Sequence, residues 1–193
     1  MNFKDQNLTE GIRLGDGKAF ERLFRKYRKK LIRFAYSYVH SIAVAEDIVQ
    51  ESFLKIWQLR KSLDPQDSIR GYLYQAVRNN ALDYNKHKSV EEKNLPDVKR
   101  THQSTAEKGE ETIADSEFVE AVQQEIEKLP DRAKEVYKLS RTNGLTYKEI
   151  AEVMDISVKT VETQMSRSLK KLRKGLKDYL PVLFVFSLIS NIF

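Results

Sequence analysis

Apolar residues recur every three or four positions along most of this 193-residue chain, which is the spacing of one face of an α-helix. The first clear example begins at Asp16 and carries basic residues between its apolar ones. Its apolar positions are Phe20, Leu23, Phe24, Tyr27, Leu31, Phe34, Ala35 and Tyr38. We interpret this stripe as core, and the basic residues as a solvated face or a phosphate contact. Because the same spacing returns in later segments, the pattern predicts an all-α fold.

A second helix is predicted after Ser41, whose hydroxyl can cap the first turn. Its inward face comprises Ala45, Ile48, Val49, Ser52 and Ile56. Another face of the same helix is acidic and partly apolar, and it comprises Asp47, Gln50, Glu51 and Leu54. Phosphate would repel this strip, so we expect any partner there to be a protein. An ordinary helix surface that balances charge is a close alternative.

Residues 60–68 are predicted to form a loop, because Asp64-Pro65 and Asp67-Ser68 interrupt the helical pattern. A third helix then covers residues 69–88, with Leu73, Ala76, Val77, Ala81 and Leu82 as its expected buried side. Its other positions mix aromatic, amide and basic groups, among them Tyr72, Asn79, Asn80, Tyr84 and Lys86. This mixture suits single-stranded nucleic acid, since bases stack on aromatic rings at roughly 1–3 kcal/mol each. Any one of the tyrosines could instead belong to the core.

Residues 87–116 lack apolar periodicity and are rich in Lys, Glu, Ser and Thr, which predicts a flexible linker. The linker divides the chain into two small helical domains, residues 1–86 and residues 117–178. The second domain should begin with a helix that Pro130 stops and whose core row is Val119, Val122, Ile126 and Leu129. A further helix over residues 131–141 should close at Asn143-Gly144 as a left-handed C-cap.

The stretch from Gly144 to Arg173 has the layout of a helix-turn-helix. Thr146 and Glu149 are spaced as a capping box, and Ser157 can cap a second helix after a short turn. The inward positions of that second helix are Val161, Met165, Leu169, Leu172 and Leu176. Its outward positions include Lys159, Thr160, Thr163, Gln164 and Arg167. Such a helix fits the major groove, where amide and guanidinium groups pair with base edges, although a solvated basic face is the simpler alternative.

The net charge of +6 favours an anionic partner. The excess lies in residues 1–86, which carry 16 Lys and Arg against 10 Asp and Glu. The absence of cysteine and of a secretory leader at the first residues is compatible with a reducing cytoplasm. The tail, residues 179–193, is apolar and too short for an ordinary bilayer span of about twenty residues. It could cover an apolar groove, bind a partner or lie at a membrane interface.

Taken in order, these parts resemble the sigma factors of bacterial RNA polymerase, specifically the extracytoplasmic-function (ECF) group. The segment AEDIVQESFLKIW resembles the family's segment for binding core polymerase. SIRGYLYQAVRNNALDYNKHK resembles its helix for the −10 promoter element, and GLTYKEIAEVMDISVKTVETQMSRSLKKLR resembles its reader of the −35 element. The resemblance covers roughly residues 10–178, with the three motifs in the family's order.

The resemblance implies a transcription initiation factor that is not an enzyme, has no cofactor or metal, and takes no small-molecule substrate. Asp47, Gln50, Glu51 and Leu54 would then meet the core polymerase. Tyr72, Asn79, Asn80, Tyr84 and Lys86, with the loop at Lys61 to Ser68, would hold melted promoter DNA. Lys159, Thr160, Thr163, Gln164 and Arg167 would read duplex DNA, and Glu162 on the same outer side departs from an all-basic surface. An anti-sigma factor would be a further partner.

A second hypothesis is a stand-alone helix-turn-helix regulator that binds duplex DNA as a dimer. It leaves the Asp47 strip and the Asn79-Asn80 helix without a function. Enzyme chemistry is disfavoured because His40, His87 and His102 show no ligand spacing.

Overall fold

The computed structural model describes residues 3–93 and 113–179, and all the regular structure in these two ranges is helical. The chain divides into two compact units, which are treated separately below. This confirms the prediction of an all-α fold with two helical parts, the second of which contains a helix-turn-helix. Most of the predicted linker and nearly all of the apolar tail lie outside the described residues. None of the described helices is long and apolar enough to cross a membrane.

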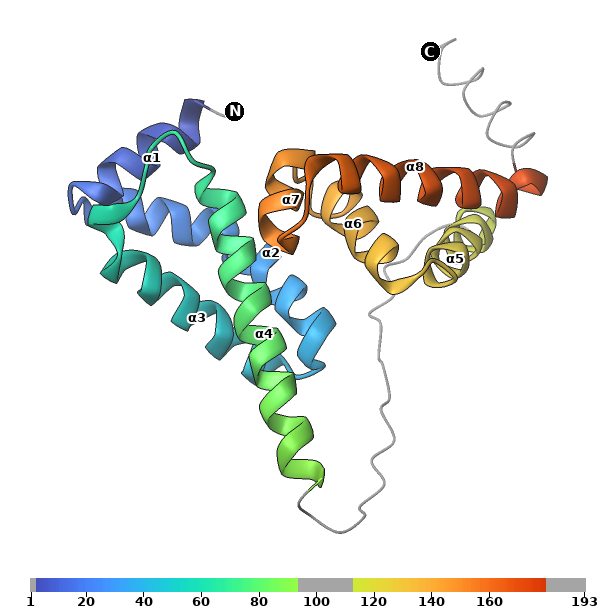
Figure 1. The fold of residues 1–193 in the computed structure, drawn as a ribbon, viewed down its shortest axis with the longest axis horizontal. Coiled ribbons are helices and arrows are strands. Elements are labelled where there is room, and N and C mark those ends of the chain that lie inside the picture. The colour runs from blue at the N-terminus through green and yellow to red at the C-terminus, as the bar shows by residue number, and fades with distance from the viewer. Residues whose placement is uncertain (1–2, 94–112, 180–193) are drawn as a thin grey trace. The chain divides into compact units, whose positions relative to one another are not determined.

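The first unit contains α1 (Phe3–Arg13), α2 (Gly17–Val39), α3 (Ile42–Gln58) and α4 (Ile69–Lys93), drawn blue to green in Figure 1. A short 3-10 helix, η1 (Arg60–Ser62), opens the predicted loop between α3 and α4. Two of these helices begin at a side-chain cap, of which the one at Ser41 was predicted. The Asp16 carboxylate accepts a hydrogen bond of 2.8 Å from the Lys18 backbone N–H, and Ser41 caps α3.

The core of the first unit forms where α2 packs against α3 and α4. The inward face predicted for α3 is buried throughout. On α4, Leu73, Val77 and Ala81 are buried as predicted, whereas Leu82 is 40% exposed and its assignment to the core was wrong. Tyr74 is instead fully buried, with its ring centroid 5.0 Å from that of Phe34. The contact with α2 therefore covers the Tyr74 side of α4 and leaves the Leu82 side open.

Helix α1 was not anticipated, because residues 3–13 contain too few apolar positions to show a period. Two of its residues are nevertheless buried, Thr9 and Ile12. Gly11 allows the close approach to α2, since a Cβ at this position would lie 2.9 Å from the Cβ of Ala19. A glycine at a helix contact is thus a packing feature that helical periodicity does not detect.

The second unit contains α5 (Ile113–Glu127), α6 (Asp131–Arg141), α7 (Tyr147–Met154), α8 (Val158–Gly175) and a short 3-10 helix, η2 (Lys177–Tyr179). Gly144 has φ = +71°, so it adopts the left-handed conformation predicted after α6. Core residues contributed by α6, α7 and α8 include Val136, Leu139, Ile150, Val161 and Met165.

Two details of the second unit and both edges of the linker differ from the sequence prediction. Val119 is 37% exposed and not part of the core, while Leu129 from the same row is buried. On α8, Leu169 and Leu176 are half-buried, and the small Ser168 is buried in their place. Helix α4 continues to Lys93 and α5 begins at Ile113, so both edges of the predicted linker are helical. The cause at the first edge is a run of helix-forming residues without Gly or Pro.

Candidate protein and nucleic-acid interfaces

The acidic strip on α3 is exposed along its whole length. Asp47, Gln50 and Glu51 are exposed, and Leu54 is 59% exposed although it is a large apolar residue. None of the three polar side chains pairs with another described residue. Glu46 on the same helix behaves differently, because it forms a 2.9 Å salt bridge with Arg28 of α2. Glu46 therefore links α3 to α2, whereas the Asp47 and Glu51 carboxylates are available to solvent.

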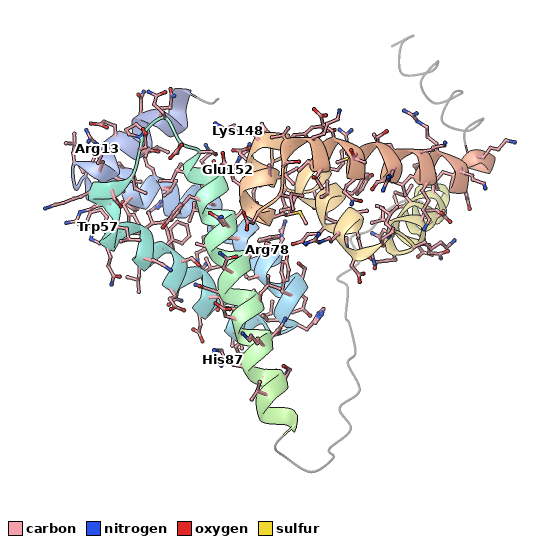
Figure 2. All side chains as sticks on the ribbon, in the orientation of Figure 1. Arg13, Trp57, Arg78, His87, Lys148 and Glu152 are labelled. Carbon is pink, nitrogen blue, oxygen red and sulfur yellow. The ribbon has the colours of Figure 1, made fainter. Side chains whose placement is uncertain are left out.

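Helix α4 carries its candidate DNA residues on two faces. One face carries Tyr72, Asn79 and Lys86, which are spaced seven residues apart. Because seven residues make about two helical turns, these side chains lie along one ridge of α4, and Asn79 and Lys86 are exposed. Asn80 and Tyr84 lie on the flank of the helix and are half-buried. In Figure 2, Arg78 lies midway along α4 and His87 lies nearer its C-terminal end, so the stretch from Asn79 to Lys86 lies between these two labelled residues.

A pocket of about 110 Å³ opens where the loop meets the start of α4. Its lining comprises Thr9, Ser62, Leu63, Asp64, Asp67, Ser68, Ile69 and Tyr72. Two local hydrogen bonds shape this loop. The Asp64 side chain accepts from the Gln66 backbone N–H at 2.8 Å, and Ser68 Oγ accepts from the Gly71 N–H at 3.1 Å. Thr9 comes from the unanticipated helix α1, so sequence reasoning missed its place in the pocket.

The turn of the helix-turn-helix is built by the predicted local bonds. The Glu149 carboxylate accepts from the Thr146 backbone N–H at 2.7 Å, and Thr146 Oγ1 accepts from the Glu149 N–H at 3.3 Å. Asp155 takes φ = +52° between the helices. Ser157 Oγ then accepts from the Thr160 N–H at 3.0 Å and caps α8. These bonds confirm the capping box and the second cap.

The outward face of α8 contains two kinds of side chain. Some already bond within the helix: Lys159 forms a 3.2 Å ion pair with Glu162, and the Thr163 hydroxyl donates to the Lys159 carbonyl at 2.8 Å. The Thr160 hydroxyl lies 2.8 Å from the Ser157 hydroxyl and so belongs to the cap. Gln164 and Arg167 have no side-chain partner among the described residues, and Arg167 is exposed. Of the five predicted outward residues, these two are the ones whose side chains are not already engaged within the described chain.

Two family models match the chain in sequence order. Sigma-70 region 2 matches residues 23–89, and Sigma-70 region 4 matches residues 119–172. The first match covers α2 to α4 and the second covers α5 to α8, and together they include all three candidate surfaces. The fold and these regions define a protein of the sigma-70 class.

Among its relatives, the chain is 31% identical over 173 residues to the ECF RNA polymerase sigma-E factor of Haemophilus influenzae, covering 85% of this chain and 90% of that protein. It is 27% identical over 188 residues to the RNA polymerase sigma-H factor of Pseudomonas aeruginosa, covering 92% and 96% of the two chains. A solved structure of the sigma factor RpoE with the anti-sigma factor NepR, from Bartonella quintana, shares the fold. Its TM-score is 0.57 at 22% identity, covering 83% of this chain and 98% of that one.

The chain therefore belongs to the ECF group of sigma-70 family RNA polymerase sigma factors. Sigma factors are non-catalytic subunits that direct RNA polymerase to promoters, so this protein is not an enzyme. Core RNA polymerase and promoter DNA are its partners in transcription initiation.

Proposed function

We propose that the α3 strip is the surface by which this sigma factor binds core polymerase. The supporting observation is that Asp47, Gln50, Glu51 and Leu54 form one exposed surface without partners in the described chain, while the adjacent Glu46 is engaged internally. An exposed leucine among unpaired acidic groups suits a partner that is basic at its rim and apolar at its centre.

The α4 surface is proposed to hold the melted −10 element. Tyr72, Asn79 and Lys86 offer a ring, an amide and a cation along the exposed ridge, with Asn80 and Tyr84 beside them. The pocket at the head of the ridge has hydroxyl, carboxylate and aromatic groups, which suit one unstacked base. Stacking on Tyr72 would contribute about 1–3 kcal/mol.

Helix α8 is proposed to lie in the major groove of the −35 element. Gln164 and Arg167 would contact base edges, since neither is engaged within the described chain. Lys159, Thr160 and Thr163 would position the helix. The Lys159 ammonium can leave its ion pair with Glu162 and bind a phosphate instead. The hydroxyl oxygens of Thr160 and Thr163 can still accept a hydrogen bond.

An anti-sigma factor is proposed as a regulatory partner, and the cytoplasm as the compartment. The related RpoE was solved with the anti-sigma factor NepR, and a subunit of bacterial RNA polymerase acts where the polymerase is. Affinity purification of the tagged chain from its native host tests this proposal. Recovery of the polymerase without any protein that inhibits transcription would contradict the anti-sigma part.

The polymerase surface can be tested by charge reversal with a matched control. Asp47→Lys should abolish co-purification with core polymerase and leave circular dichroism unchanged, because the Asp47 side chain is exposed and forms no hydrogen bond or ion pair with a described residue. Glu46→Gln changes the adjacent carboxylate and removes the Arg28 salt bridge, so it should alter stability slightly and binding little. Normal polymerase binding by the Asp47→Lys chain would overturn the assignment.

A further inference from the structure

A hydrogen-bond chain joins the polymerase-binding helix α3 to the promoter-binding helix α4. Ser52 is fully buried on the inner face of α3, and its hydroxyl lies 2.8 Å from the Ile48 carbonyl oxygen. The Asn80 amide of α4 lies 3.3 Å from the same hydroxyl oxygen. The two helices lie side by side in Figure 1 and pack directly on one another.

The order of donors in this chain fixes the orientation of the Asn80 amide. A carbonyl oxygen can only accept, so the single Ser52 proton goes to Ile48. The Ser52 oxygen can then only accept from its other neighbour, and Asn80 must present Nδ2 to it. The distances agree, since 2.8 Å is ordinary for O–H···O, while 3.3 Å is long for that bond and closer to the N–H···O range.

The consequence is that Asn80 turns its Oδ1 away from α3. No other described residue bonds to that oxygen. Asn79, the preceding residue, is exposed and makes no side-chain bond to the described chain, so its amide can rotate to present either edge. The two adjacent asparagines therefore differ: Asn79 can turn either edge outward, whereas the contact with Ser52 uses one of the two Asn80 N–H donors and keeps its Oδ1 acceptor facing away from α3.

We propose that Ser52 is a positioning residue for promoter selectivity, holding Asn80 so that its Oδ1 selects a base with an exocyclic amino group. This inference rests on the proposed role of α4 in holding the −10 element. Cytosine, adenine and guanine carry such amino donors, whereas thymine has only an imino donor, so thymine should be disfavoured at one position. Without Ser52, the amide can turn and this preference should weaken.

The experiment compares base selection by wild type, Ser52→Ala, Asn80→Ala and the double variant, each with core polymerase on a library randomised in the −10 region. Ser52→Ala should reduce the preference at one position roughly fivefold, which corresponds to one neutral hydrogen bond, and leave the other positions unchanged. In the Asn80→Ala background, Ser52→Ala should change the selection no further. If Ser52 only stabilised the packing of α3 and α4, Ser52→Ala would change the base selection in the Asn80→Ala background as well.

Ser168→Ala is the matched control. Ser168 is also buried in a helix and donates to the carbonyl four residues earlier at 2.8 Å, but it belongs to the second unit. It should lower stability about as much as Ser52→Ala and leave −10 selection unchanged. A change in −10 selection equal to that of Ser52→Ala would overturn the proposal.

A measurement on the free protein is independent of transcription. In nuclear magnetic resonance spectra, the Asn80 side-chain amide protons should exchange with solvent several-fold more slowly in wild type than in Ser52→Ala. Equal exchange rates would contradict the orientation. If wild type supports no transcription, the proposed role of α4 fails together with this inference. If wild type and Asn80→Ala select differently but Ser52→Ala selects as wild type does, only the inference fails.

Discussion

The capping box at the start of α7 provides a sharp stability prediction, because its two side chains bond to each other and to the backbone. Replacing Thr146 with valine keeps the shape and removes the hydroxyl. Two contacts of that hydroxyl are lost, its 3.3 Å bond from the Glu149 N–H and its 2.8 Å bond to the Glu149 carboxylate. The third contact, from the Thr146 N–H to the carboxylate, remains.

The magnitude follows from what is lost. Removing an N-cap side chain costs about 1 kcal/mol, within a range of roughly 0.5–2 kcal/mol. The bond to the carboxylate adds a charge-assisted interaction, but Thr146 is exposed and water replaces part of it. We therefore expect a loss of about 1–1.5 kcal/mol. For a helical unit of this size, each kcal/mol lowers the melting temperature by roughly 4–8 °C.

The assay is thermal unfolding followed by circular dichroism, with Thr146→Ser as the matched control. Serine keeps the hydroxyl and should retain most of the wild-type stability. Equal melting of the Thr146→Val and wild-type chains would show that the capping box contributes nothing. An equal loss in the serine variant would show that the methyl group, and not the hydroxyl, is responsible.

Three further predictions concern other parts of the chain. Hydrogen bonds from Lys138 and Lys134 hold the pKa of Glu127 below its ordinary value of 4.5. The ionised Glu127 carboxylate therefore stabilises the fold fully at a pH above 4.5, and this stabilisation is lost as the pH falls through the lowered pKa. The stability difference between wild type and Glu127→Gln, measured by urea unfolding, should therefore be larger at neutral pH than in acid; a difference independent of pH would contradict this. Gly11→Val should displace α1 from α2 and lower the melting temperature measured by circular dichroism, because even a Cβ would lie 2.9 Å from that of Ala19; unchanged melting would show that the contact relaxes freely. Arg167→Ala should reduce transcription from a cognate promoter roughly tenfold if it makes a paired contact to a base edge, and unaffected transcription would remove it from the −35 surface.

Local rules predicted the helix ends well, because a cap is a bond between residues a few positions apart. Ser41, Thr146 and Ser157 all cap as predicted, and Asp16, where the first periodic helix was expected to begin, caps α2. Periodicity located the buried faces but not their edges. Leu82 fits the apolar spacing of α4, yet which edge is covered depends on where α2 lies.

The sequence predicted which residues of the candidate surfaces are exposed, but not the hydrogen bonds that connect those residues to other helices. Exposure of Asp47, Glu51 and Arg167 follows from helical spacing alone. The contact between Ser52 and Asn80 does not, because residues 28 positions apart meet only through the packing of two helices. The same reason explains why Thr9 was missed at the pocket.

The most direct test of the account is transcription in vitro with the purified chain, bacterial core polymerase and a randomised promoter library. The account predicts that a two-part motif with a fixed spacer is selected only when the chain is present, and that the Asp47→Lys chain selects none. If no template is used while the chain alone shifts duplex DNA as a dimer, the chain acts as a stand-alone regulator and the central claim is contradicted.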